Sequence, residues 1–209
     1  MLTIKKMLYK LAHILRDKLP IIWNLIGIIN SCLFALRYRK FKSGVTNILE
    51  TYSKDSIAKG KLLRFERVNG ANVNALAKMF SEQPTEAFEY FKPHDFDIKT
   101  LKGLAKDKSF LAYVVMADNH VVGYFFQRSF FWGKSFRGYM TDYRWRRCGI
   151  NRLMNLCATE ISSLMKLRVF GTISPNNVAS LKSAQSANKV NIIEQMENGD
   201  YYVQYLPKD

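Results

Sequence analysis

The sequence predicts an α/β (α+β) domain over residues 59–209, preceded by a helical extension over residues 1–58. Three features predict the domain. They are short alternating runs rich in β-branched and aromatic residues, apolar stripes at three- and four-residue spacing between those runs, and turn signals that close hairpins. About 150 residues with this pattern can enclose one sizeable hydrophobic core.

The domain begins with one predicted strand and two predicted helices. Residues 61–68 alternate as a half-buried strand does, and Asn69-Gly70 ends the strand as a turn. An apolar stripe over residues 73–80 predicts the first helix. Asp97 stands where an N-cap belongs, directly before a second stripe over residues 98–104.

Three strands and a long helix follow. Residues 110–116 and 121–126 flank Asp118-Asn119, which predicts an antiparallel hairpin. Residues 134–143 are rich in aromatic side chains and alternate as a third strand. Apolar residues at helical spacing over residues 150–165 then predict a helix of about four turns.

The C-terminal part adds a strand, a short helix and a second hairpin. Residues 168–174 form the predicted strand, and Asn177 lies near the start of the helix as a cap. Residues 190–196 and 201–206 flank Asn198-Gly199, which is a strong signal for a hairpin turn.

A basic, glycine-containing turn lies between the third strand and the long helix, Arg146-Arg147-Cys148-Gly149-Ile150-Asn151. The first turn of a helix leaves backbone N–H groups without intrahelical partners, and the helix dipole adds positive potential there. Gly149 has no Cβ, so a diphosphate can approach the backbone, and Arg146 and Arg147 add charge. We interpret the turn as a phosphate site. A plain basic connection is the alternative, because a lone glycine turn is a weak motif.

The pattern Arg146-x-x-Gly149-x-Asn151 resembles the pyrophosphate-binding motif of the GNAT superfamily of acyl-CoA-dependent N-acyltransferases. That motif ends in Gly or Ala, so Asn151 departs from it, and its side chain would crowd the phosphates or hydrogen-bond to them. The family's order of elements fits the chain from about Lys59 to the end. The resemblance implies a mixed, mostly antiparallel sheet of six to seven strands flanked by about four helices.

A second family segment is only partly present. Asn177 and Ser180 fit its spacing, and in the family this helix start lines the acyl-CoA groove. The usual Tyr, a general acid for the leaving thiolate, falls near Ala184, and Asn188-Lys189 replaces the usual Gly-Phe. These departures keep a second function open: a non-catalytic acyl-CoA-binding or membrane-associated interaction protein on the same fold.

The resemblance implies an N-acetyltransferase that moves an acetyl or other acyl group from acyl-CoA to a primary amine. The amine attacks the thioester directly through a tetrahedral intermediate, with no metal. Acetyl-CoA or another acyl-CoA is the co-substrate. The residues expected to bind it are Tyr139, Met140, Thr141, Arg146, Arg147, Cys148, Gly149, Ile150, Asn151, Asn177 and Ser180.

Two residues are candidates for the proton transfers. Asp142 is the carboxylate nearest to the expected reaction centre and the candidate general base, although a strand-end residue that only complements Arg144 or Arg146 is the alternative. Tyr143 is the candidate donor to the thiolate, with packing as its alternative. Cys148 is not expected to be a nucleophile, because no histidine lies near it in sequence.

The acceptor is expected to be an amino sugar or another small-molecule amine. Five aromatic residues precede the third strand and predict either an aromatic-lined acceptor side or a buried sheet face. They are Phe125, Phe126, Phe130, Phe131 and Trp132.

The formal net charge of +15 fits an anionic co-substrate, an anionic membrane or a nucleotide-linked substrate. Nucleic acid is not favoured, because the basic residues are spread along the chain and no recognised binding motif accompanies them. The three cysteines show neither a paired pattern nor metal-ligand spacing, which indicates a cytoplasmic protein.

The extension contains two helical patterns. Residues 4–15 form a basic amphipathic stripe, and residues 19–36 are almost uncharged and end at the basic segment 37–42. Three interpretations remain open. Residues 1–42 form a peripheral or re-entrant anchor at the inner face of an anionic membrane, or they pack on the domain or a homodimer partner, or residues 19–36 span the membrane.

Overall fold

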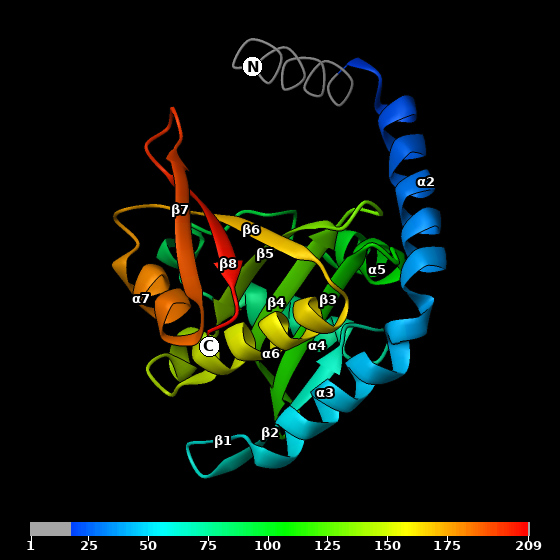
Figure 1. The fold of residues 1–209 in the computed structure, drawn as a ribbon. Helices are drawn as coiled ribbons and strands as arrows, with labels where there is room; N and C mark the ends of the chain where they lie inside the picture. Colours follow the sequence, from blue (N-terminus) through cyan, green and yellow to red (C-terminus); the bar gives the residue numbers. More distant parts are fainter. Residues whose placement is uncertain (1–17, 209) are drawn as a thin grey trace.

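A computed structural model of the chain describes residues 18–208 and shows one twisted sheet with helices on both faces (Figure 1). The basic amphipathic helix expected over residues 4–15 lies outside the described residues. The strands are β1 (Ile57–Ala58), β2 (Lys61–Arg67), β3 (Phe110–Ala117), β4 (His120–Ser129), β5 (Lys134–Thr141), β6 (Arg168–Ile173), β7 (Lys189–Gln195) and β8 (Tyr201–Leu206).

The sheet order is β1-β2-β3-β4-β5-β6-β8-β7, and every neighbouring pair is antiparallel except β5 and β6. The mixed, mostly antiparallel sheet predicted from the sequence is therefore confirmed, with the two-residue β1 added to the seven expected strands. The predicted strand over residues 134–143 ends early, at Thr141. It ends there because the Asp142 side chain accepts the backbone N–H of Arg144 and caps a short 3-10 helix.

Six α-helices are described: α2 (Pro20–Tyr38), α3 (Lys42–Asp55), α4 (Val73–Ser81), α5 (Ile98–Lys106), α6 (Ile150–Leu164) and α7 (Val178–Ala187). Short 3-10 helices are η1 (Arg39–Phe41), η2 (Thr85–Phe88) and η3 (Tyr143–Trp145). Both predicted caps are present. Asp97 accepts the N–H of Thr100 at the start of α5, and Asn177 accepts the N–H of Ser180 at the start of α7.

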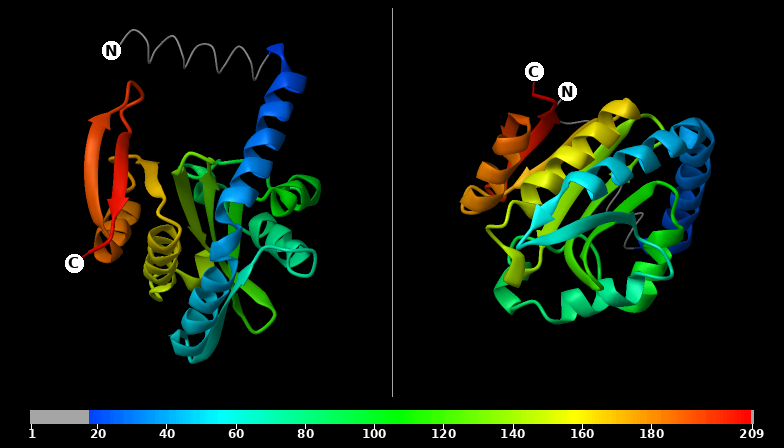
Figure 2. Two further views of the ribbon diagram at one scale, coloured as in Figure 1. Left: turned by 45° about the vertical axis from the view of Figure 1, so that its right-hand side comes forward. Right: turned by 90° about the horizontal axis from the view of Figure 1, so that it is seen from below.

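The helices form two layers around the sheet, with α3 and α6 on one face and α4 and α5 on the other (Figure 2). Strand alternation separates the two cores. Tyr113 and Phe125 pack toward α6, whereas their neighbours Val114 and Tyr124 pack toward α4.

Helix α3 was not anticipated as an element and is part of the core. Leu49 is buried, the Tyr52 and Phe65 ring centroids are 5.5 Å apart, and the Ser53 hydroxyl accepts the N–H of Phe65 at 2.8 Å. Gly44 lies so close to α6 that a Cβ there would stand 2.8 Å from Leu164. The hydrophobic core therefore begins before residue 59, and the division of the chain into two domains at that point stays a prediction.

Candidate functional site

Strands β5 and β6 run side by side only briefly. They pair in parallel at residues 134–136 and 168–170 and then diverge. Beyond that point β5 keeps its partner β4 as far as Thr141, and β6 keeps its partner β8 as far as Ile173. The backbone groups on the facing edges of residues 137–141 and 171–173 therefore have no strand across from them and are available to a ligand.

A groove of about 850 Å³ opens where the two strands diverge. Its lining comes from both strands, the turn into α6, the start of α7 and residues 86–93. The groove brings together all but one of the residues expected to bind the co-substrate. Those that line it are Tyr139, Met140, Thr141, Arg146, Arg147, Gly149, Ile150, Asn151, Asn177 and Ser180. Cys148 is not among them. Binding by these residues stays a prediction.

The start of α6 forms one end of the groove. Arg147 and Gly149 adopt left-handed backbone conformations, with φ of 61° and 79°. No side chain of the described residues caps the helix, so the first-turn N–H groups lack side-chain acceptors. Ile150 is buried in the core beneath and fixes the turn in place. The uncapped end, the helix dipole and the adjacent arginines together favour an anion.

No protein-family model and no curated protein sequence matches the chain. Solved structures do match it. The GNAT domain of PAT from S. lividans superposes with a TM-score of 0.62 at 10% identity, over 71% of this chain and 93% of that one. Ribosomal-protein-S5-alanine acetyltransferase from Vibrio fischeri gives 0.59 at 14% identity, over 70% and 93%. RimJ from Mycobacterium smegmatis, solved in complex with CoA-disulfide, gives 0.58 at 15% identity, over 70% and 82%.

The chain has the fold of the GNAT superfamily. Neighbours with this fold include an N-acetyltransferase from Thermoplasma acidophilum in complex with coenzyme A. The groove of this chain lies where β5 and β6, the parallel pair of the sheet, diverge, beside the turn that leads from β5 into α6.

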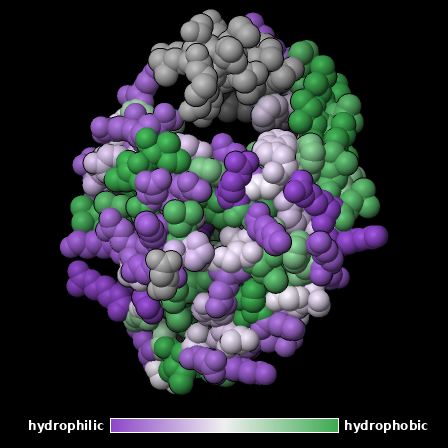
Figure 3. Space-filling model, viewed as in Figure 1, coloured by the Kyte–Doolittle hydropathy of each residue, from purple (hydrophilic) through white to green (hydrophobic). Residues whose placement is uncertain are grey.

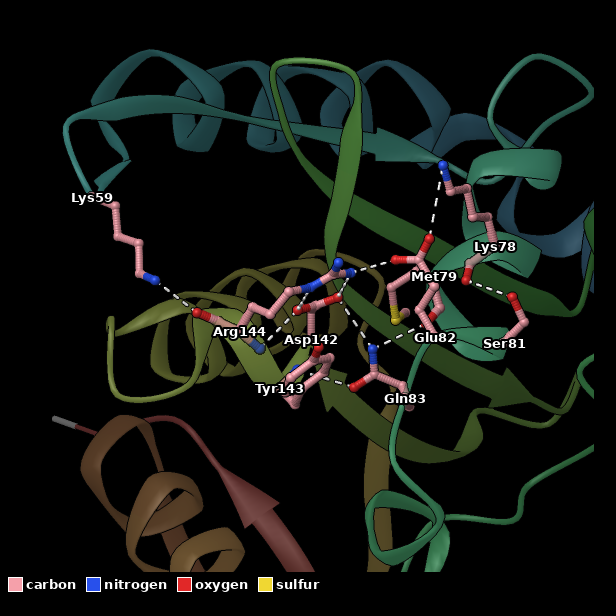
Figure 4. A network of polar contacts seen from close by, with 9 residues as sticks. All are labelled: Lys59, Lys78, Met79, Ser81, Glu82, Gln83, Asp142, Tyr143 and Arg144. Carbon is pink, nitrogen blue, oxygen red and sulfur yellow. Dashed lines mark hydrogen bonds and ion pairs between the residues drawn. The ribbon is translucent and has the colours of Figure 1, made fainter.

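Asp142 lies at the end of β5 in this GNAT fold and is almost fully enclosed, at 1% exposure. Its two carboxylate oxygens accept four hydrogen bonds, three from Arg144 (2.8, 3.0 and 2.8 Å) and one from the Gln83 side chain at 3.1 Å (Figure 4). Burial alone would raise the pKa of Asp142, but the hydrogen bonds from Arg144 and Gln83 outweigh it and hold the pKa below its ordinary value. These contacts fasten β5 to the end of α4.

Tyr143 lies beside this network and also outside the groove lining. Its backbone N–H donates to Gln83 Oε1 at 3.0 Å, and the Arg144 guanidinium lies 5.2 Å from its ring centroid. The structure therefore places both proton-transfer candidates next to the groove and not on its wall, with Asp142 buried and the Tyr143 side chain exposed.

The Asn151 side chain belongs to a hydrogen-bonded chain at the start of α6. Its Oδ1 accepts from Asn155 Nδ2 at 2.7 Å, and Asn155 Oδ1 accepts from Asn188 Nδ2 at 3.3 Å. Asn188 Oδ1 then bonds to the Thr159 hydroxyl, which also accepts from Arg137 Nη1 at 2.8 Å. A polar chain thus connects the first turn of α6 to β5 beneath the groove.

On the opposite wall of the groove, Phe126 is the one residue that the sequence indicated as a possible part of an acceptor side. Glu86 of η2 lines this wall together with Tyr90, Phe91, Phe126 and Phe136. Among the described residues, Glu86 is the only carboxylate that lines the groove, where the basic residues are Lys92, Arg137, Arg146, Arg147 and Arg152. No motif surrounds Glu86, so only the fold reveals its position.

The five clustered aromatic residues divide between three environments. Phe126 lines the groove, and Phe125 is fully buried in the core beneath α6. The turn between β4 and β5 carries the other three, with the Phe130 and Trp132 ring centroids 4.6 Å apart.

Proposed function

We propose that the chain is an acyl-CoA-dependent N-acyltransferase of the GNAT type, acting on a small-molecule amine in the cytoplasm. The observation that carries the proposal is the groove between diverging strands that ends at the uncapped, basic N-terminus of α6. A diphosphate at that end would leave the pantetheine arm to run along the free edge of residues 139–141. The free cysteines Cys32, Cys148 and Cys157 fit a reducing compartment.

The reaction needs few enzyme groups. The amine nitrogen attacks the thioester carbonyl carbon, and an unpaired backbone N–H of β5 stabilises the oxyanion of the tetrahedral intermediate. The intermediate collapses with loss of the C–S bond, so the amide forms and the thiolate leaves. The amine must first lose a proton, which a group on the groove wall has to accept.

We assign that acceptor role to Glu86. Its carboxylate stands on the wall opposite α6 among aromatic rings, where it attracts a cationic amine into a groove that is otherwise basic. Asp142 is less suited to the role, because four hydrogen bonds occupy its oxygens and its pKa is lowered. We propose that Asp142 is a positioning residue that holds the end of β5.

The rings of Tyr90, Phe91, Phe126 and Phe136 offer apolar faces to the body of the amine. An amino sugar or another small amine with one apolar face fits this wall.

The test of the activity is direct. Purified protein should gain thermal stability with acetyl-CoA and release free thiol when an amino sugar, an aromatic amine or a polyamine is added. Binding without thiol release across the panel would favour the non-catalytic acyl-CoA-binding protein. Absence of binding would remove the proposal.

The role of Glu86 has its own test. Glu86→Gln should lower kcat/KM for the amine at least about tenfold. The Kd for acetyl-CoA should stay unchanged, because the substitution removes a carboxylate only from the wall where the amine is proposed to bind. Glu89→Gln is the matched control, three residues further on and exposed outside the groove lining. Tyr143→Phe tests the donor predicted from the sequence and should leave the rate near that of the wild type. Equal rates for the two Glu variants would refute the assignment of Glu86.

A further inference from the structure

Helix α2 packs on the domain through its C-terminal half, from Asn30 onward, and residues 20–29 are exposed apart from the half-buried Trp23. One face packs on the domain through Asn30, Phe34 and Tyr38, of which the two aromatic residues are buried. The opposite face carries a stripe of apolar residues at helical spacing, hereafter the outer stripe: Ile21, Leu25, Ile28, Cys32 and Leu36. The figures place this face along the outside of the molecule (Figure 1, Figure 3).

The outer stripe is strongly exposed. Ile21 is 83% exposed, Leu36 65%, Ile28 60% and Leu25 54%, and further exposed isoleucines flank the stripe at Ile22, Ile26 and Ile29. Only 11% of the most apolar 18-residue window in the helical segment 20–55 is buried. A contiguous apolar patch of this kind on a folded domain marks an interaction surface.

The domain-facing side of α2 fixes the helix and opposes a full membrane span. Asn30 Nδ2 donates to the Ser129 carbonyl at 3.1 Å, and Asn30 Oδ1 accepts the N–H of Phe131 at 3.0 Å. The Ser31 hydroxyl accepts the N–H of Lys108 at 2.9 Å. By length and composition this is the one described helix able to cross a membrane, but crossing would break these contacts and pull Phe34 and Tyr38 from the core.

The outer stripe contains only Cys32 besides aliphatic side chains. Asn30 and Ser31 lie off the stripe, face the domain and are satisfied there. Asn24 is exposed and borders the stripe. The helix therefore turns its hydrogen-bonded polar residues to the domain and leaves its apolar side open.

Cations stand at both ends of the outer stripe. Lys18 precedes α2, and Arg37, Arg39, Lys40 and Lys42 follow its last turns, all exposed. The exposed rings of Phe131 and Trp132 lie next to α2, where the Phe131 carbonyl accepts from Arg37 at 3.0 Å. Cations at both ends and flanking aromatic rings match an anionic headgroup layer that lies parallel to the helix axis.

We propose that α2 lies flat on an anionic phospholipid bilayer, with the outer stripe inserted between the headgroups and the folded domain held on the cytoplasmic side. The helix is about 28 Å long, and insertion of about 5–10 Å buries the stripe while Arg39 and Lys40 reach the phosphates. This inference is independent of the proposed acyltransferase activity.

The test compares vesicle binding of the full chain and two matched variants. Wild-type protein should sediment with phosphatidylglycerol–phosphatidylcholine vesicles and at least about tenfold less with phosphatidylcholine alone, with binding that weakens as salt rises. Ile28→Glu places a charge in the stripe and should lower vesicle affinity at least about tenfold. Ile57→Glu changes an isoleucine of similar exposure (67%) on β1 and should bind like the wild type.

Two further measurements separate membrane docking from other outcomes. A fluorophore on Cys32, in a Cys148→Ser background, should shift to the blue when phosphatidylglycerol vesicles are added. Thermal unfolding of Ile28→Glu should match that of the wild type, which shows that the variant folds. The proposal is overturned if Ile28→Glu keeps full vesicle affinity. It is also overturned if sedimentation velocity shows that the stripe joins two copies and that the dimer, not the monomer, is lost in Ile28→Glu.

Discussion

Asn151 and Asn188 both depart from the residues that GNAT motifs usually carry, and in this structure they are joined. Asn155 donates to Asn151 and accepts from Asn188, and both Asn155 and Asn188 are 1% exposed. Because Oδ1 of Asn151 is occupied by Asn155, its Nδ2 is the group left for a ligand on the groove wall. If the diphosphate binds at this turn as proposed, the side chain would present a donor to it, where a small residue would present none.

The first prediction tests that donor. Asn151→Asp replaces the amide donor with a carboxylate and should weaken acetyl-CoA binding at least about tenfold, because a negative charge would face the phosphates. Calorimetric titration with acetyl-CoA measures the effect. Asn191→Asp, on the exposed strand β7, adds the same charge away from the groove and serves as the control. Unchanged affinity in Asn151→Asp would show that this residue does not meet the phosphates.

The second prediction concerns Asp142 and pH. Its folded-state pKa is below its unfolded value, so its contribution to stability is present above the unfolded pKa of about 3.9 and is lost as pH falls through the folded pKa. Asp142→Asn should be about 2 kcal/mol less stable than the wild type at pH 6.5, and the gap should shrink as the pH falls below about 4. Urea unfolding at several pH values measures it, with Asp200→Asn as control. A difference in free energy of unfolding that does not vary with pH would contradict the stabilisation by ionised Asp142 and its hydrogen bonds from Arg144 and Gln83.

Among the secondary-structure elements, most strands and helices could be predicted from hydrophobic periodicity. Strands and helices from residue 61 onward were predictable, because each has a clear period and an identifiable turn or cap at its end. Helix α3 was not predictable as a separate element. Its apolar residues Leu49 and Tyr52 lie among polar residues, and no turn signal separates α3 from α2. Only its packing on β2 and α6 reveals it.

The candidate site was predictable to a similar degree. The turn into α6 could be predicted from the local sequence, because consecutive residues supply its glycine, its arginines and its helix start. The wall that carries Glu86 could not, because it is assembled from the loop after α4 and from strands far away in sequence. The enclosure of Asp142 by Gln83, 59 residues away, was equally invisible in the sequence.

The third prediction addresses the turn into α6. Gly149→Ala places a Cβ on a backbone with φ of 79°, which costs about 1 kcal/mol although no atom lies within 4 Å. The shifted N–H groups should also weaken acetyl-CoA binding. Gly199→Ala is the matched control, with φ of 87°, equal open space and a position in the β7–β8 turn. It should lose similar stability and keep its affinity. Equal affinities for the two variants would contradict a role for the turn in binding.

For the whole molecule, the two proposals place positive charge on two separate surfaces. Of 32 Lys and Arg residues against 17 Asp and Glu, five line the groove and five border α2. The groove opens where β5 and β6 diverge, whereas α2 contacts the turn between β4 and β5 and lies across the molecule from α7 and β7 (Figure 1). On these proposals, acyl-CoA and an anionic membrane would not compete for one surface.

Calorimetric titration of the intact chain with acetyl-CoA, and separately with S-acetylpantetheine, measures whether the groove holds acyl-CoA with its diphosphate at the start of α6. We expect one acetyl-CoA per chain. S-acetylpantetheine lacks the diphosphate and the phosphoadenosine and should bind at least about a hundredfold more weakly. Equal affinity for the two compounds, or no binding of acetyl-CoA, would contradict this binding mode.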